Sequence, residues 1–139
     1  MSTGTLDLVV LPAEFAVCRL SPADDIPQWA HNEQLSSVTR TADEMSVVCP
    51  AKDVPVRAQA ERGWRVLKVA SPMDFSSVGI LASLAGPLAQ ASIPNFAIST
   101  FATDDVLVRA EDLPRAVAVL RDEGHTVDER EWRRPPCAG

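Results

Sequence analysis

The order of strand-like and helix-like segments in residues 64–129 places the strongest constraint on how this chain can fold. Alternating or β-branched apolar residues indicate strands, and apolar residues recurring every three or four positions indicate helices. In chain order the segments are a strand at 64–70, a helix at 78–91, strands at 93–99 and 105–109, a helix at 113–123 and a strand at 125–129. This order is typical of the ferredoxin-like α+β fold, in which two crossover units build one antiparallel sheet with both helices on one face.

The ends of the two helices carry local signals. Ser76 or Ser77 is expected to cap the first helix, and Asp112 the second. Gly124 is the expected stop of the second helix, because glycine readily adopts the left-handed conformation that follows a helix. The first helix should turn one apolar stripe toward the sheet, made of Val78, Leu81, Leu84, Leu88 and Ala91.

The first half of the chain is richer in strands and poorer in helices. Strands are predicted at 6–11 and 14–20, and a hairpin is formed by 35–40 and 45–49. Only two short helices are expected, at 26–32 and at 56–62, the second stopped by Gly63.

An internal repeat relates the two halves. Residues 20–24 (LSPAD) align with residues 70–74 (ASPMD), and residues 38–42 with residues 98–102 at a longer offset. The offset between aligned residues increases at the place where the second half has a long helix and the first half only a short one. Chance matching of two hairpins and two Ser-Pro turns is the alternative. Duplication predicts two ferredoxin-like units with antiparallel sheets: a degenerate unit at 1–62, a second unit at 63–130, and a flexible tail at 131–139.

Charge and cysteine content narrow the class of protein. The formal net charge of -6 argues against a nucleic-acid partner, and the tail arginines Arg130, Arg133 and Arg134 are expected to be solvated. No apolar run approaches the roughly 18 residues that span a membrane, so no membrane partner is expected. Three cysteines without a CxxC pair predict reduced thiols in a cytoplasmic protein, with Cys18 and Cys49 as small buried side chains.

The sequence offers little for catalysis. His31 and His125 are the only histidines; His125 follows a helix C-terminus, where the helix dipole favours it structurally. No Ser-His-Asp arrangement, phosphate-binding glycine motif or metal-ligand spacing is present. The pairs Asp24-Asp25 and Asp104-Asp105 are adjacent residues, which point to opposite faces of a strand. No catalytic residue, metal or cofactor is therefore expected.

The turn at residues 71–80 is the first candidate binding segment. It joins a strand to a helix, so unpaired N–H groups and the positive helix end face whatever lies above the sheet. An α-carboxylate suits this place, and Asp74 or Asp104 could pair with an amino group. Gly79 lowers helix propensity, which a close approach of ligand or backbone would explain. An ordinary N-cap with a tolerated glycine is the alternative.

The hairpin tip at residues 99–104 is the second candidate. An exposed Phe101 beside hydroxyl groups and the Asp104 carboxylate suits a small amphiphilic ligand or a protein partner. A satisfied turn with Phe101 folded onto the sheet is the alternative.

These two segments carry a family resemblance. The pattern D-F-x-x-x-G-I, followed by I-S-T-F-x-T-D within residues 62–125, resembles the tandem ACT-domain proteins, among them the CASTOR arginine sensors and the aspartate kinase regulatory domains. The resemblance implies two ACT folds and an amino-acid site between them or between subunits. It implies the ligand-binding residues Asp74, Ser76, Ser77, Val78, Gly79, Ile80, Thr100, Phe101, Thr103 and Asp104. Ala102 departs from the Asp or Asn common in the family, and no G-I turn follows Asp24, so one site per chain is expected.

Together these features predict an amino-acid-binding regulatory protein without catalytic activity, which forms a homo-oligomer and acts through its assembly or a protein partner. The alternative is an ACT-like dimerisation or docking module with no small-molecule ligand.

Overall fold

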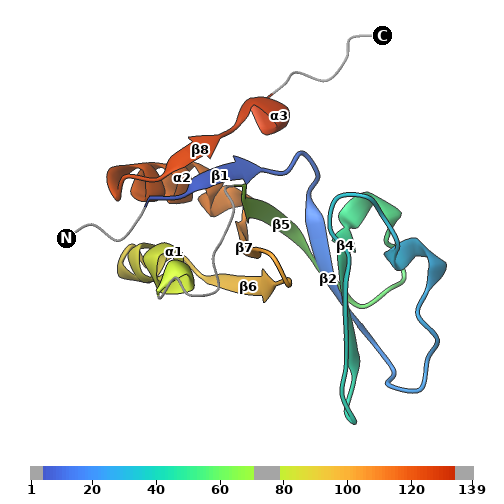
Figure 1. Cartoon of the computed structure of the whole chain (residues 1–139). Coiled ribbons are helices and arrows are strands. Elements are labelled where there is room, and N and C mark those ends of the chain that lie inside the picture. Colours follow the sequence, from blue (N-terminus) through green and yellow to red (C-terminus); the bar gives the residue numbers. More distant parts are fainter. Residues whose placement is uncertain (1–4, 71–78, 134–139) are drawn as a thin grey trace, which may run out of the picture. The chain divides into compact units, whose positions relative to one another are not determined.

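The computed structural model describes residues 5–70 and 79–133 and divides the chain into two compact units (Figure 1). The C-terminal unit comprises residues up to Pro12 together with those from Arg65 onward. The N-terminal unit comprises Ala13–Trp64. The change of unit at Trp64 lies close to the boundary expected after residue 62, whereas residues 5–12 belong with the C-terminal unit.

The C-terminal unit has the predicted order of strands and helices. Its elements are β1 (Asp7–Val10), the later part of β5 (Ala60–Val69), α1 (Ile80–Gln90), β6 (Asn95–Ser99), β7 (Asp104–Arg109), the 3-10 turn η3 (Ala110–Asp112), α2 (Leu113–Asp122), β8 (Thr126–Asp128) and α3 (Arg130–Arg133). The strands are arranged β6-β7-β5-β1-β8. From β5 to β8 this is the expected ferredoxin-like sequence of elements.

Strand β1 is inserted into this sheet. It pairs antiparallel with β5 on one side and parallel with β8 on the other, so it occupies the place beside β5 that β8 would otherwise fill. Leu8 and Val10 are buried in the core of the unit, which explains why this short apolar strand joins the sheet.

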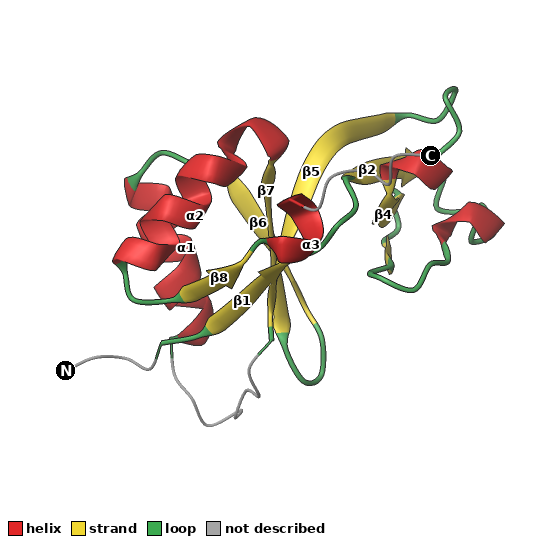
Figure 2. Cartoon of the chain, turned by 90° about the horizontal axis from the view of Figure 1, so that it is seen from above, coloured by secondary structure: helices red, strands yellow, loops and turns green. Residues whose placement is uncertain are grey.

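Both long helices cover one face of the sheet (Figure 2). Leu84 and Leu88 of α1 and Leu120 of α2 pack there with residues of β1, β5 and β7. Helix α1 begins later than predicted, with Gly79 rather than Ser76 or Ser77 at its N-cap. Leu81, expected in the buried stripe, is 39% exposed.

The second helix and the chain end agree with the local signals in part. Asp112 stands at the N-cap position of α2, but its side chain makes no capping hydrogen bond and instead lies 3.7 Å from Arg115 Nη2. Gly124 follows the helix with a φ of 97°, as expected. Residues 131–133, predicted as flexible tail, instead complete α3. There the Trp132 ring packs against the core, and the Arg65 guanidinium lies 5.3 Å from the ring centroid.

The N-terminal unit is a four-stranded antiparallel sheet. Across this sheet the two strands of the hairpin precede the first strand of the unit, as β6 and β7 precede β5 in the C-terminal unit. The elements of the N-terminal unit are β2 (Phe15–Leu20), the 3-10 turn η1 (Gln28–Ala30), β3 (Ser37–Arg40), β4 (Met45–Pro50), the 3-10 turn η2 (Ala51–Asp53) and the start of β5. The strands lie in the order β3-β4-β2-β5, and single 3-10 turns stand where a ferredoxin-like unit has helices. The unit has the strands but not the helices of a ferredoxin-like unit, and its origin by duplication stays a prediction.

The helix predicted at residues 56–62 is wrong. Strand β5 begins at Ala60 and pairs with β2, with Val17 opposite Glu61 and Phe15 opposite Trp64. These partners are two positions apart on β2 but three positions apart on β5, so β5 carries an extra residue, which is a β-bulge. Gly63, with a φ of 87°, adopts the conformation that such a bulge requires. Gly63 is therefore a bulge residue rather than a helix stop.

Candidate functional site

The β6–β7 hairpin forms one side of the candidate site. Its tip is closed by two threonines: the Thr100 N–H donates to the Thr103 carbonyl over 2.8 Å, and the Thr103 N–H donates to the Thr100 hydroxyl over 3.1 Å. Phe101 is 87% exposed, so the ring is not folded onto the sheet. The tip is a hydrogen-bonded polar turn that presents one apolar ring.

Asp104 is the buried acid of the hairpin. It is the first residue of β7, lies opposite Ser99 of β6, and is 8% exposed. The Ser99 hydroxyl donates to its Oδ1 over 2.5 Å, which orients the carboxylate and leaves Oδ2 as a further acceptor. Ser99 is absent from the predicted binding residues, because its role arises from cross-strand pairing.

The hairpin tip is joined to the end of β5. The Thr103 hydroxyl donates to the carbonyl of Val69, the last residue of β5, over 2.8 Å. The segment that leaves β5 contains the predicted site residues Asp74, Ser76, Ser77 and Val78, which lie outside the described residues. The chain segment carrying the first candidate therefore starts beside the second candidate.

Gly79 and Ile80 mark the start of α1. Gly79 has a φ of 82°, in the left-handed region that favours glycine, and no described atom lies within 4 Å of a Cβ added there. Backbone conformation rather than a close neighbour thus explains this glycine in the described part of the chain. Ser83 closes the turn, because its N–H donates to the Gly79 carbonyl over 2.8 Å and its hydroxyl to the Ile80 carbonyl over 2.6 Å.

Asp105 lies on the opposite face of β7 from Asp104, as expected for adjacent strand residues. Asp105 is buried, and burial raises its pKa, while the nearby Lys68 ammonium partly offsets that rise and Asp104 adds to it. The folded state therefore holds a proton on Asp105 more tightly than the unfolded state does.

Asp105→Asn is expected to stabilise the protein at neutral pH. A carboxyl whose pKa is raised by folding favours the folded state below its unfolded pKa of about 4 and loses that advantage as pH rises through the folded pKa. The amide does not ionise, so the variant should gain stability over the wild type above pH 4 and match it below. Urea unfolding at several pH values measures this, with exposed Asp43→Asn as control. Lower stability of Asp105→Asn at neutral pH would mean that the attraction of the nearby Lys68 charge outweighs the cost of burying the carboxylate.

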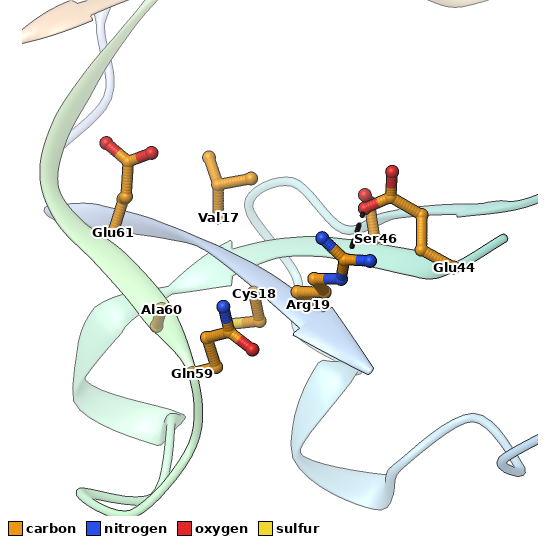
Figure 3. Close-up of a pocket in the computed structure, with 8 residues that line it drawn as sticks. All are labelled: Val17, Cys18, Arg19, Glu44, Ser46, Gln59, Ala60 and Glu61. Carbon is orange, nitrogen blue, oxygen red and sulfur yellow. Dashed lines mark ion pairs between the residues drawn. The ribbon is translucent and has the colours of Figure 1, made fainter. Parts of the chain in front are cut away.

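A cavity lies within the N-terminal unit, apart from the predicted site residues (Figure 3). It has a volume of about 460 Å³ and is lined by Val17, Cys18, Arg19, Glu44, Ser46, Gln59, Ala60 and Glu61. Val17, Glu61 and the pair formed by Arg19 and Glu44 project from one side of the strands, with 4.0 Å between Arg19 Nε and Glu44 Oε1. Mixed charge of this kind could hold a small polar molecule. No sequence motif marks this cavity, because alternating polar residues on a strand are also typical of a solvated face.

The thiols of the N-terminal unit are free and buried, as predicted. Cys18 and Cys49 lie on neighbouring strands in the small core beneath the 3-10 turns. Burial raises the pKa of both thiols, that of Cys49 to about 12. Both remain protonated at neutral pH and act as small apolar side chains.

Neither histidine has the surroundings of a catalytic base. His31 is exposed, whereas both ring nitrogens of the buried His125 bond to backbone groups. Those bonds, rather than a helix dipole, explain the structural role of His125. Among residues 5–70 and 79–133, no three His, Cys, Asp or Glu side chains lie together as a metal site would require, and no helix is long and apolar enough to cross a membrane.

Two protein families match the chain. The ACT domain matches residues 59–122, and a family described as an N-terminal domain matches residues 13–57. These ranges fall on the two parts of the fold, with β5 at their boundary.

Individual proteins resemble the chain over different lengths. A crystal structure of a protein from Agrobacterium tumefaciens has a TM-score of 0.85 and 35% identity, covering 89% of this chain and 92% of that one. The regulatory subunit of aspartate kinase from Thermus thermophilus covers 88% of this chain and 99% of its own, with a TM-score of 0.59 and 8% identity, so it shares the fold alone.

The human protein named cytosolic arginine sensor for mTORC1 subunit 1 is 41% identical over 64 residues. The match covers 44% of this chain and 20% of the human protein. The matched part of the chain thus spans about a fifth of the length of this relative.

Proposed function

Because the chain belongs to the same family as the Agrobacterium tumefaciens protein and carries an ACT domain at residues 59–122, we propose that it is a regulatory protein that binds an amino acid and has no catalytic activity. The observation that carries the proposal is the buried, oriented carboxylate of Asp104 in a hairpin bonded to the end of β5. The ACT-domain match and the name of the arginine sensor support a regulatory role.

The chemistry of the described groups suits an amino acid. In the proposed site the Asp104 carboxylate, oriented by Ser99, accepts hydrogen bonds from an ammonium or other cationic group. The first N–H groups of α1 suit an α-carboxylate, since a helix N-terminus favours negative charge. Phe101 offers an apolar ring, and Thr100 and Thr103 shape the tip. We include Asp74, Ser76, Ser77 and Val78 in the proposed site as members of the turn that precedes Gly79.

We further propose that the protein is cytoplasmic and acts as a homo-oligomer or through a protein partner. Within the described residues β6 pairs only with β7, so its outer edge is open to another strand. The relative named as a cytosolic sensor and the free, buried cysteines support the location.

Thermal unfolding in the presence of each of the twenty amino acids tests the function. One amino acid should raise the melting temperature, because a ligand that binds only the folded state adds about 2.7 kcal/mol of stability at a hundredfold excess over its Kd. A stable oligomer that responds to none of the twenty would instead favour a docking module without a small ligand. The exposure of Phe101 is the observation that favours that second function.

A further inference from the structure

Helix α1 contains a proline, which leaves one backbone carbonyl without its helical partner. Pro87 has no N–H group to donate to the carbonyl of Ser83, which is one turn earlier in the helix. A partly buried carbonyl that loses its hydrogen bond costs stability unless another donor takes over.

His125 supplies that donor. Its Nε2 lies 3.2 Å from the Ser83 carbonyl oxygen, and its Nδ1 lies 3.0 Å from the Leu6 backbone nitrogen. Because the Leu6 N–H must donate, Nδ1 is the acceptor, so the hydrogen of the neutral ring is on Nε2. The ring is 6% exposed, and the His125 N–H donates to the Leu120 carbonyl at the end of α2 over 3.1 Å. The imidazole therefore has a fixed tautomer and a fixed position.

Ser83 links this imidazole to the predicted site residues. Its N–H and hydroxyl donate to the carbonyls of Gly79 and Ile80, while its own carbonyl accepts from His125. On the other side of the ring, Leu6 immediately precedes β1, and its carbonyl accepts from the Thr126 N–H over 3.0 Å. A continuous series of hydrogen bonds thus joins the first turn of α1 to the beginning of β1.

We propose that His125 is a positioning residue that couples the first turn of α1 to strand β1, in place of the helical hydrogen bond that Pro87 removes. The proposal deepens the proposed function, because the coupled turn carries part of the proposed amino-acid site. Movement of this turn when an amino acid binds would be passed to β1, the strand between β5 and β8.

Two substitutions test the hydrogen bond from His125 to Ser83 separately from the hydrogen bond between His125 and Leu6. His125→Asn keeps an acceptor near the position of Nδ1 but is too short to reach Ser83, whereas Pro87→Ala returns a helical N–H to the Ser83 carbonyl. In the wild-type background, His125→Asn should raise amide hydrogen exchange of the first turn of α1 about fivefold, the effect of losing one hydrogen bond. In the Pro87→Ala background the same substitution should change it less than about twofold, because the helical bond is restored. An equal effect in both backgrounds would mean that His125 only fills space, and would overturn the proposal.

A third substitution tests the transmission without any amino acid. Gly79→Ala strains the start of α1, since its φ of 82° disfavours a side chain. When Gly79→Ala is the only substitution, this strain should raise the hydrogen-exchange rate of the Leu6 amide. When it is combined with His125→Asn, which removes the hydrogen bond to Ser83, that rate should not rise. If Gly79→Ala alone leaves the exchange rate of the Leu6 amide unchanged, the proposed coupling is overturned, whatever the melting-temperature scan with amino acids shows.

The unmodified protein provides a check that needs no variant to fold. The ¹⁵N chemical shifts of His125 in histidine-labelled protein should report hydrogen on Nε2 and none on Nδ1. A ring with hydrogen on Nδ1 could not accept from Leu6 and would contradict the arrangement.

Discussion

Leu84→Ala is expected to destabilise the protein by about 2–5 kcal/mol, the usual cost of removing a large side chain from a packed core. Leu84 is 1% exposed and belongs to the core between α1, α2 and the sheet. The free energy of unfolding, obtained from urea titration followed by circular dichroism, measures the change. Because Leu84 holds α1 against the sheet, the variant should also weaken the proposed site at the start of that helix.

Leu81→Ala is the matched control, because the same substitution is made one turn away in the same helix. Leu81 is 39% exposed, so its truncation should cost less than about 1 kcal/mol. Equal destabilisation at the two positions would show that α1 buries a wider apolar stripe in solution than it does in this single chain.

Asp104→Ala is expected to abolish the rise in melting temperature caused by the responding amino acid, with loss of the full ligand contribution of about 2.7 kcal/mol at a hundredfold excess over Kd. The substitution removes the carboxylate that Ser99 orients. The folded structure should persist, since Asp104 is the first residue of β7 and lies at the end of its strand. Thermal shift and calorimetry with the same amino acid measure the effect.

Two variants isolate the role of this charge. Asp104→Asn keeps the shape and can still accept from Ser99, yet should also lose the response, because its neutral amide binds a cation weakly. Asp105→Asn changes the neighbouring acid on the opposite face and should retain the response in full. A response retained by both Asp104 variants would move the proposed site away from the hairpin.

Local signals predicted much of this fold. The alternation in residues 64–70 and the helical spacing in residues 113–123 identified elements that the structure confirms, as did Gly124 at the end of α2. Asp112 marks the start of α2, but its side chain does not make the expected capping bond. The prediction for Gly63 is wrong, because a glycine after a short apolar run indicates a helix stop and a bulge equally well. Only pairing with Phe15 of β2 reveals the bulge.

The candidate site was predictable in outline but not in its contacts. The polar hairpin and the turn into α1 are visible as motifs, and they point to Asp104. The bonds from Ser99 to Asp104 and from Thr103 to Val69 are not visible, because they depend on which strands are neighbours in the sheet. The same holds for Pro87, whose place inside a helix is explained by a histidine in a later segment.

Periodicity and turn chemistry over a few residues are enough to predict the order of strands and helices in residues 64–129 and most of the apolar faces they bury, whereas the hairpin of the candidate site was singled out mainly by a family resemblance. The position of β1 between β5 and β8, and the link that His125 makes between Leu6 and Ser83, emerge only when the chain is folded. Leu6 and His125 are 119 positions apart, and a hydrogen bond between such distant residues leaves no periodic trace in the chain. Strand pairing creates these contacts, and pairing is chosen by the burial of the whole sheet rather than by any one segment.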